Sequence, residues 1–203
     1  ETEEDVRAAE LRNREALLRA RLKRMVGHDA VPARYVGKGF ADYECTSKGQ
    51  AKALAAVQAF AERVLAAEQA GNLILIGGMG TGKTHLACAA VQALAAQCRP
   101  AMHINTGWMF RKIRDSWRLD AGHSTQDVMD VLARLDLLVI DEVGGRWGTE
   151  TEQILLGDML MQRYERNAPT ILIANENIHG VRGCIGERAF DRARESARVV
   201  IFD

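Results

Sequence analysis

Short apolar runs alternate with longer amphipathic stretches over most of the chain. Compact apolar runs bounded by turn-forming residues predict buried strands, whereas apolar positions at helical spacing predict helices. Runs of the first kind lie at 72–76, 101–105, 136–142, 170–175 and 198–202. The helical stretches between them lie near 83–97, 107–118, 125–134, 150–166 and 186–195. Because the strands lack alternation and are separated by helices, the pattern predicts an α/β fold with a five-stranded parallel sheet flanked by helices.

Polar residues at the expected helix starts support these elements. Ser47 and Gln50 have the spacing of a capping box and open a further helix ahead of the first strand. Ser124 is the expected N-cap of the helix that follows it, and Thr149 with Glu152 opens the next helix. These local signals indicate where the helices begin independently of the hydrophobic pattern.

The part of the chain before the sheet has a different character. Residues 3–26 are charged and rich in helix-forming residues, which predicts an N-terminal helix with one narrow apolar stripe. The stripe consists of Leu11, Leu18, Leu22 and Met25. Residues 27–46 contain Pro32 and several glycines and predict an extended linker. We therefore expect residues 1–27 to form an N-terminal helix or linker, and residues 28–203 to form the main domain.

Composition and charge narrow the function only slightly. The 203 residues suit one domain with a sizeable core. Lys plus Arg and Asp plus Glu number 27 each, so the net charge favours neither nucleic acid nor a membrane, although a local basic face would still suit nucleic acid. The four cysteines form no C-x-x-C pair, which argues against a zinc site or a disulfide framework, and we expect all four to be buried thiols. Without a secretory signal or an apolar run of about 18 residues, we expect a cytoplasmic protein with no membrane contact.

Residues 77–85, "GGMGTGKTH", follow directly on the first predicted strand and lead into a predicted helix. They fit the pattern G-x-x-x-x-G-K-[ST], in which the glycines let backbone N–H groups turn inward around a phosphate. The lysine can reach the outer phosphates, and the threonine hydroxyl can bind Mg²⁺. We expect the whole loop to bind ATP or ADP, with these residues in contact: Gly77, Gly78, Met79, Gly80, Thr81, Gly82, Lys83, Thr84 and His85.

Polar residues also end the third and fourth predicted strands. Asp141 and Glu142 close "LLVIDE", at the edge where parallel sheets bind their ligands. Asp141 is suited to bind Mg²⁺, directly or through another ligand, and Glu142 is suited to polarise a water molecule for attack on the γ-phosphorus. Asn175 could orient that water or contact the γ-phosphate. We expect Thr84 and Asp141 to form the metal site, and Glu142 and Asn175 to act in catalysis.

Four segments in this order, "GGMGTGKTHLA", "LLVIDEVG", "ILIAN" and "IGERAFDR", resemble the AAA+ ATPases of the DnaC/DnaI helicase-loader group, to which the transposition helper ATPase IstB is closely related. The resemblance covers roughly residues 28–203 and implies a P-loop AAA+ core of the ASCE class with the sheet order 5-1-4-3-2. By this resemblance the lysine and threonine of the glycine loop look like the Walker A pair. Asp141 and Glu142 look like Walker B, and Asn175 looks like sensor 1.

The segment "GERAFDR" is the most specific of these motifs. Its last residue, Arg192, looks like the arginine finger that such ATPases insert into the nucleotide site of a neighbouring subunit, and Arg188 is expected to assist it. The two arginines are four residues apart, so a helix places them on one face. The family also implies a sensor 2 segment after the last strand and a helicase-binding module before the core. Since the chain runs from Glu1 to Asp203, we expect a fragment without sensor 2 that hydrolyses ATP weakly, with residues 1–27 as a remnant of that module.

The resemblance implies an ATPase that loads a replicative helicase onto single-stranded DNA and self-associates through the arginine finger. Three alternatives stay open: an IstB-like transposition helper, a P-loop kinase for a small molecule, and an adaptor that uses ATP only to assemble. Residues 105–118 mix aromatic side chains with arginine and lysine, a combination that single-strand binders use for stacking and backbone contact. We nevertheless expect Trp108, Phe110 and Trp117 to be core residues, because large aromatic side chains are mostly buried.

Overall fold

The structure is a computed structural model of the chain. It describes residues 30–118, 120–144, 149–175 and 178–202, together with Val6, Ala9, Asn13, Ala16, Leu17 and Ala20. The apolar stripe expected along the N-terminal helix lies outside the described residues, so that helix and the domain boundary at residue 27 stay predictions. No helix in the described part of the chain is long and apolar enough to cross a membrane.

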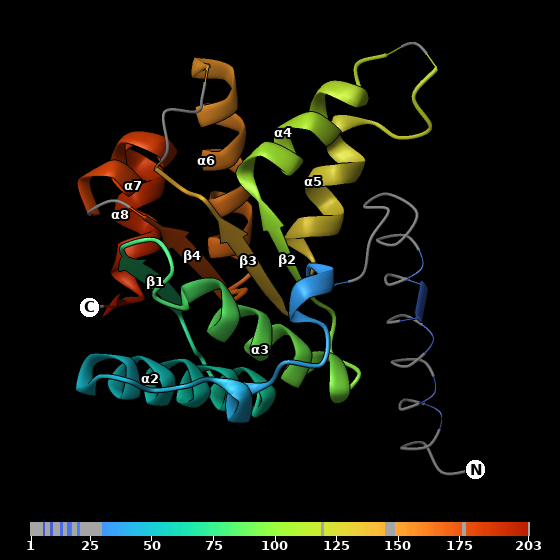
Figure 1. Cartoon of the computed structure of the whole chain (residues 1–203). Helices are drawn as coiled ribbons and strands as arrows, with labels where there is room; N and C mark the ends of the chain where they lie inside the picture. Colours follow the sequence, from blue (N-terminus) through green and yellow to red (C-terminus); the bar gives the residue numbers. More distant parts are fainter. Residues whose placement is uncertain are drawn as a thin grey trace.

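A parallel sheet forms the middle of the molecule (Figure 1). Its strands are β1 (Asn72–Gly77), β2 (Ala101–Asn105), β3 (Leu137–Asp141), β4 (Thr170–Ala174) and β5 (Ala197–Phe202). Every neighbouring pair is parallel, and the order across the sheet is β2-β3-β4-β1-β5. The predicted fold class and the sheet order implied by the family resemblance are therefore confirmed.

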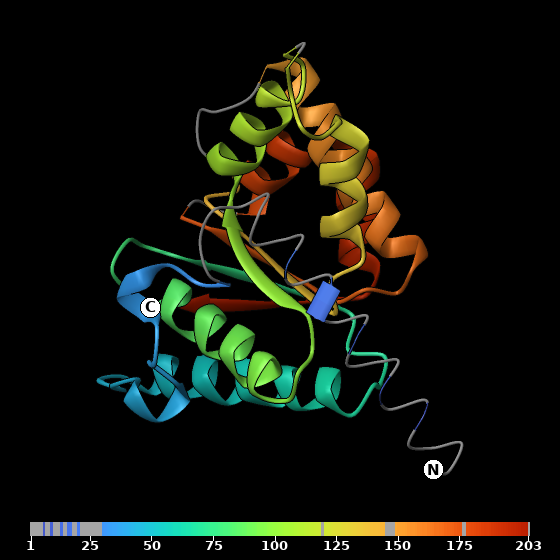
Figure 2. The same cartoon turned by 90° about the vertical axis from the view of Figure 1, so that its right-hand side faces the viewer.

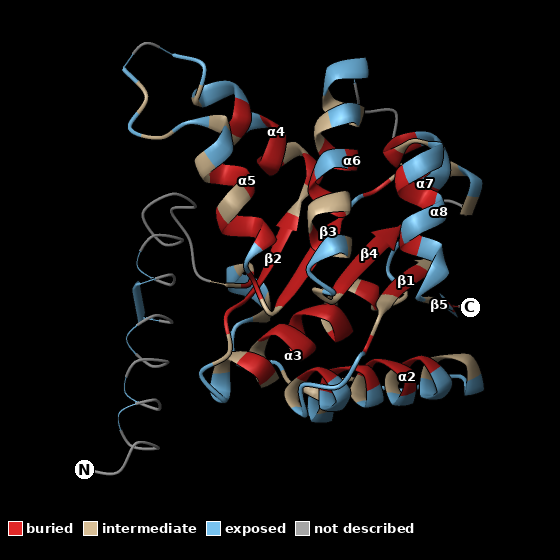
Figure 3. Cartoon of the chain, turned by 180° about the vertical axis from the view of Figure 1, so that it is seen from behind, coloured by how far each residue is buried: buried red, intermediate tan, exposed pale blue. Residues whose placement is uncertain are grey.

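Helices cover both faces of the sheet (Figures 1 and 2). One face carries α2 (Lys48–Leu65) and α3 (Lys83–Ala96). The other carries α4 (Thr106–Asp115), α5 (Thr125–Ala133), α6 (Glu150–Glu165), α7 (Ile178–Ile185) and α8 (Glu187–Glu195). In β1, Leu73 and Leu75 belong to the core under α2 and α3, whereas Ile74 belongs to the opposite core. Strands β1 to β4 are covered on both faces (Figure 3), so their sequences are mostly apolar. In β5, at the edge of the sheet, Val199 and Ile201 are exposed.

The helix starts predicted from polar residues are confirmed. Ser47, Ser124 and Thr149 each accept a hydrogen bond from the backbone N–H three residues further on. Helix α7, by contrast, has no counterpart among the predicted elements. Two glycines within α7 weaken its helical signal, although its buried residues have the spacing of a helix face.

Residues 30–46 form a strap that packs across α3, and the extended linker predicted there is wrong for this part. The strap contains two turns of 3₁₀-helix, at Ala33–Tyr35 and Phe40–Asp42. Gln92 of α3 holds it: the side-chain oxygen accepts from the N–H of Gly37 at 2.7 Å, and the side-chain nitrogen donates to two further strap carbonyls at 2.9 and 2.8 Å. The linker prediction failed because the partner of this backbone is a side chain 55 residues away.

Three residues expected in the core lie on the surface instead. Cys45 and Cys98 are exposed, whereas the other two cysteines are buried. Cys98 occupies the tight turn after α3, with a left-handed φ of 58°. Trp117 is 59% exposed just beyond α4, while the other two aromatic residues expected in the core are buried. Each of these three residues lies outside a helix or strand, where the chain leaves the core.

Arg163 of α6 is a fully buried charged side chain near the amino end of the sheet. Burial lowers the pKa of Arg163 to about 9. Its guanidinium donates to the Thr170 hydroxyl and to three backbone carbonyls, at 2.6 to 3.0 Å: Leu132, Leu135 and Pro169. These bonds tie the connection between α5 and β3 to the connection between α6 and β4.

Arg163→Ala is expected to lower the free energy of unfolding by about 3 kcal/mol or more, because buried acceptors lose their donor and a cavity is left behind. Equilibrium unfolding in urea measures the change. Arg166→Ala, at an exposed arginine one turn further on, is the matched control and should change stability by less than about 0.5 kcal/mol. Equal effects of the two substitutions would contradict the role assigned to Arg163.

Candidate functional site

The glycine loop links β1 to α3 at the carboxyl edge of the sheet. At Gly77, an added Cβ would lie 2.4 Å from the carbonyl oxygen of Phe202 in β5. Gly82 has a left-handed φ of 91°, and a Cβ there would lie 2.4 Å from the ring of Tyr43 in the strap. Both positions therefore require glycine for space, and Gly82 requires it for backbone conformation as well. This explains physically why the motif has glycine at its two ends.

The side chain of Lys83 bends back over the loop. Its amine donates to the carbonyls of Gly77 and Gly78 at 2.7 and 2.6 Å. The Thr81 hydroxyl also donates to the Gly78 carbonyl, at 2.9 Å, and Met79 is 81% exposed. Burial lowers the pKa of Lys83. A phosphate on the loop would give this buried amine a charged partner in addition to neutral carbonyls.

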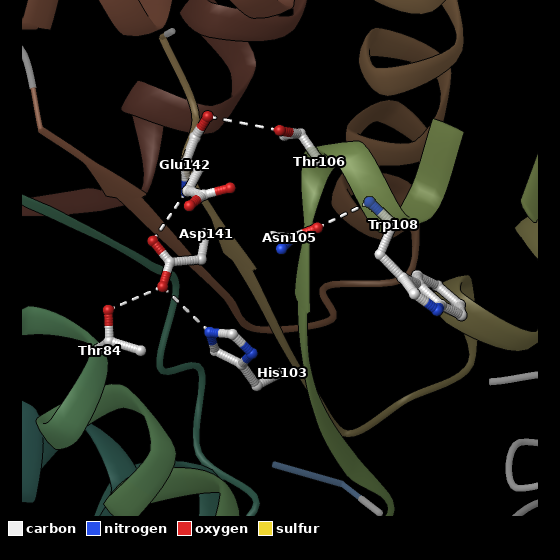
Figure 4. A network of polar contacts seen from close by, with 7 residues as sticks. All are labelled: Thr84, His103, Asn105, Thr106, Trp108, Asp141 and Glu142. Carbon is white, nitrogen blue, oxygen red and sulfur yellow. Dashed lines mark hydrogen bonds and ion pairs between the residues drawn. The ribbon is translucent and has the colours of Figure 1, made fainter. Parts of the chain in front are cut away.

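Asp141, the last residue of β3, gathers hydrogen-bond donors from separate elements (Figure 4). The Thr84 hydroxyl of α3 donates to Oδ2 at 2.8 Å, and Nε2 of His103 in β2 lies 3.1 Å from the same oxygen. Oδ1 accepts from the N–H of Glu142 at 2.7 Å. Burial alone would raise the pKa of Asp141, but the contacts with His103, Thr84 and the Glu142 N–H hold that pKa below its usual value. Asp141 is therefore a buried, ionised carboxylate bonded to the residue that ends the glycine loop.

Glu142 has a left-handed backbone, with φ of 62°. This conformation costs a residue with a Cβ about 1–2 kcal/mol. Contacts on both sides impose it: its carbonyl accepts from the Thr106 hydroxyl at 3.4 Å, and the N–H of Val143 donates to the carbonyl of Ile173 at 2.9 Å. The side chain is exposed. Strain of this kind at the edge of a sheet is typical of functional residues.

Asn175 follows β4 directly and is exposed. The parallel register pairs Ile76 of β1 with Ala174 of β4, so Gly77 at the end of β1 and Asn175 just after β4 lie at the same edge of the sheet. The sheet thus brings the glycine loop, the carboxylates of Asp141 and Glu142 at the end of β3, and Asn175 to one edge. The contact of each of these residues with a nucleotide stays a prediction.

The strap adds to this edge a residue, Tyr43, for which the sequence predicted no role. The hydroxyl of Tyr43 donates to the carbonyl of Thr81 at 3.0 Å. The ring of His85 lies edge-on to the Tyr43 ring, with 5.5 Å between centroids, and its Nε2 is 3.1 Å from the carbonyl oxygen of Gly39. His85 therefore holds the strap against the glycine loop, and its expected contact with a nucleotide stays a prediction. The contact of Tyr43 depends on the fold, and its position in the sequence gives no signal for it.

Arg188 and Arg192 both lie exposed on α8. Nη1 of Arg192 is 3.2 Å from Oε2 of Glu195, and its guanidinium lies 5.7 Å from the centroid of the Tyr164 ring. The Tyr164 hydroxyl donates to the same Glu195 oxygen at 2.8 Å. Arg192 is thus held on the outer surface by residues of α6 and α8, and the role of both arginines stays a prediction.

The oxygen atoms at this edge suit Mg²⁺ bound together with a nucleotide. The Thr84 hydroxyl and the Asp141 carboxylate are hard oxygen ligands 2.8 Å apart. The described residues contain no group of three or more His, Cys, Asp or Glu able to hold a metal ion by themselves. Mg²⁺ in phosphate-binding proteins takes one or two side-chain oxygens and completes its shell with phosphate and water. The loop N–H groups and the N-terminus of α3 suit the phosphates themselves.

Known proteins with similar sequences are ATP-binding and replication proteins. A family model described as IstB-like ATP binding protein matches residues 6–193. The replicative helicase loader DnaC of Escherichia coli K12 is 30% identical over 158 residues, which make up 76% of this chain and 62% of the loader. DnaC of Buchnera aphidicola subsp. Schizaphis graminum is 25% identical over 174 residues, 86% of this chain and 70% of that protein. The chain therefore spans less than two thirds of the E. coli loader.

Solved structures show the same fold. The DnaC helicase loader superposes with a TM-score of 0.73 at 21% identity, over 85% of this chain and 100% of the other. DnaI superposes with a TM-score of 0.70 at 21% identity, over 85% of this chain and 95% of the other. AMPPCP-bound DnaA from Aquifex aeolicus superposes with a TM-score of 0.71 at 19% identity, over 86% of this chain and 52% of the other. The resemblance to AAA+ ATPases of the helicase-loader group is confirmed, and the chain belongs to the IstB-like ATP-binding protein family.

Proposed function

We propose that this chain is the ATPase core of an AAA+ switch that loads a replicative helicase onto single-stranded DNA. The hydrogen bond between Thr84 and Asp141 carries the ATP-site part of the proposal, because it joins the glycine loop to a strand-end carboxylate, the arrangement that suits ATP bound with Mg²⁺. ATP binding follows from the family. The similarity to replicative helicase loaders supports a helicase as the partner.

Each residue at the sheet edge has a part in hydrolysis. Lys83 and the loop N–H groups hold the outer phosphates of ATP. Thr84 and Asp141 would hold Mg²⁺, which would supply positive charge against those phosphates when bound. Glu142 accepts a proton from the attacking water, and Asn175 orients that water. The exposure of Glu142 supports this division of labour, because Asp141 is buried and already bonded while its neighbour faces solvent.

Arg192 acts, in this proposal, on the nucleotide bound by a neighbouring subunit. Its exposure on α8 supports a role outside its own fold. The Glu195 carboxylate and the Tyr164 ring, at 3.2 and 5.7 Å, hold the guanidinium at the surface. Arg188 lies one helical turn earlier and assists it. Self-association through α8 would then complete each ATP site.

Single-stranded DNA is proposed to bind beside the end of α4. Trp117 is 59% exposed there, and Arg111, Arg114 and Arg118 are exposed as well. Two of these arginines pair with acidic side chains at 2.8 and 3.3 Å, but surface pairs of this kind contribute at most about 1 kcal/mol and are readily exchanged. An exposed indole among cations suits base stacking combined with backbone contact.

An IstB-like transposition helper is the second candidate, supported by the family model over residues 6–193. Both candidates share the same ATP site, so the protein partner distinguishes them. A small-molecule kinase is less favoured, because the similar sequences are those of an IstB-like family and of replicative helicase loaders.

The full protein is expected to be captured by the purified replicative helicase of its own cell in the presence of ATP, and to load that helicase onto circular single-stranded DNA. Loading is measured as subsequent unwinding of an annealed strand. Lys83→Ala is the control and should remove ATP-dependent loading, because the loop loses the cation that holds the outer phosphates. Capture by a purified transposase and not by the helicase would replace the loader with the transposition helper.

Arg192→Ala is expected to bind ATP normally but to hydrolyse it slowly, because each site loses a cation supplied by its neighbour. Arginine fingers of other nucleotide hydrolases raise the rate of hydrolysis about 10³–10⁵-fold. Arg194→Ala, at another exposed arginine of α8, should leave the rate nearly unchanged. Mixing the Arg192 and Lys83 variants should restore partial activity, since some interfaces then pair an intact loop with an intact finger. Loss of ATP binding in the Arg192 variant, or no recovery in a co-assembled mixture, would contradict action between subunits.

A further inference from the structure

His103 is a polar residue inside an apolar strand. β2 has the sequence AMHIN, and His103 is 6% exposed. A buried polar side chain without a partner costs about 1–3 kcal/mol, so an imidazole in this place needs one. The backbone N–H of His103 donates to the carbonyl of Ala30 in the strap at 2.8 Å. The side chain meets Asp141, whose Oδ2 lies 3.1 Å from Nε2.

The register of the sheet produces this contact. His103 lies opposite Val139, and Asn105 lies opposite Asp141. Because side chains alternate along a strand, Val139 and Asp141 share one face, the face packed against α3. His103 reaches the carboxylate from the neighbouring strand, and Thr84 reaches it from α3. Figure 4 shows the imidazole and the hydroxyl converging on one carboxylate oxygen.

These two donors differ in their relation to a metal ion. The hydroxyl of Thr84 is itself a predicted ligand of Mg²⁺, so its orientation depends on the metal. The imidazole of His103 donates from Nε2 both as the neutral Nε2–H form and as the imidazolium, and it is directed at the carboxylate. His103 can therefore orient Asp141 without being a metal ligand itself. Residues that orient a metal ligand in this way typically change metal affinity about 10–100-fold.

We propose that His103 is a positioning residue that holds the Asp141 carboxylate in the orientation required by the Mg²⁺ that accompanies ATP. The inference rests on the proposed ATP site and assigns to it a residue that no sequence motif marks. The phosphates themselves are bound by the glycine loop, which His103 does not contact. Removal of His103 should therefore weaken the response to Mg²⁺ and leave metal-free nucleotide binding intact.

The test compares substitutions that keep or remove a donor at the position of Nε2. His103→Gln keeps one, because its amide nitrogen reaches as far as Nε2 does. His103→Ile removes it while suiting a buried strand, and His103→Asn removes it while remaining polar. Met102→Leu is the matched control, at a buried residue of the same strand that belongs to the opposite core. Affinity for a fluorescent ATP analogue is measured with EDTA and then over a Mg²⁺ titration, with thermal unfolding of the nucleotide-free protein alongside.

The Ile and Asn variants are expected to need at least about 10-fold more Mg²⁺ than the parent to reach half of the Mg²⁺-dependent change in affinity for the analogue. The affinity of these two variants for the nucleotide in EDTA should stay within about twofold of the parent's. The Mg²⁺ midpoints of the Gln and Leu variants should match that of the parent within about threefold, well below the effect expected for loss of a ligand-orienting group. An unchanged Mg²⁺ midpoint in a folded Ile or Asn variant would overturn the proposal. A variant in which nucleotide affinity in EDTA, affinity for Mg²⁺ and melting temperature all fall together would overturn the proposal in favour of a purely structural role. A parent protein that binds the analogue equally with and without Mg²⁺ would instead overturn the proposed metal site, and this inference with it.

Discussion

The buried carboxylate of Asp141 holds the carboxyl edge of the sheet together. An ionised carboxylate away from water is tolerated only when several donors surround it. Here the donors come from α3, from β2 and from the backbone just after β3. Because β4 lies between β3 and β1, the bond to Thr84 spans the end of β4 and fixes the glycine loop relative to β3. The position of the loop therefore depends on the order and parallel register of the whole sheet.

The glycine loop is also confined from two sides by parts of the chain that are distant in sequence. Phe202 of β5 closes the space beside Gly77, and Tyr43 of the strap closes the space beside Gly82. Tyr43 donates to a loop carbonyl as well, and His85 packs against Tyr43. The loop thus keeps its shape through contacts with two segments distant in sequence, the strap before α2 and strand β5. The strain at Glu142 is held in the same way, by hydrogen bonds on either side of it.

The strands, most helices and the glycine loop could be predicted because each has a local cause. Apolar runs, cap residues such as Ser47 and the spacing of Lys83 and Thr84 within their motif all act within a few residues of one another. The strap could not be predicted in this way, because its backbone is satisfied by Gln92, far along the chain. The contact of His103 with Asp141 likewise arises from the pairing of β2 with β3, which no local pattern encodes.

In the proposed function, this edge of the sheet hydrolyses ATP, with Glu142 as the base beside the buried carboxylate of Asp141. The most direct test is the rate of ATP turnover by Glu142→Gln, measured together with its affinity for ATP. The amide keeps the shape of the side chain and loses its basicity, so ATP should bind as tightly as in the parent protein. Turnover should fall by about 10²–10⁴-fold. An unchanged rate in a folded, ATP-bound variant would contradict the proposed role of Glu142 as the base.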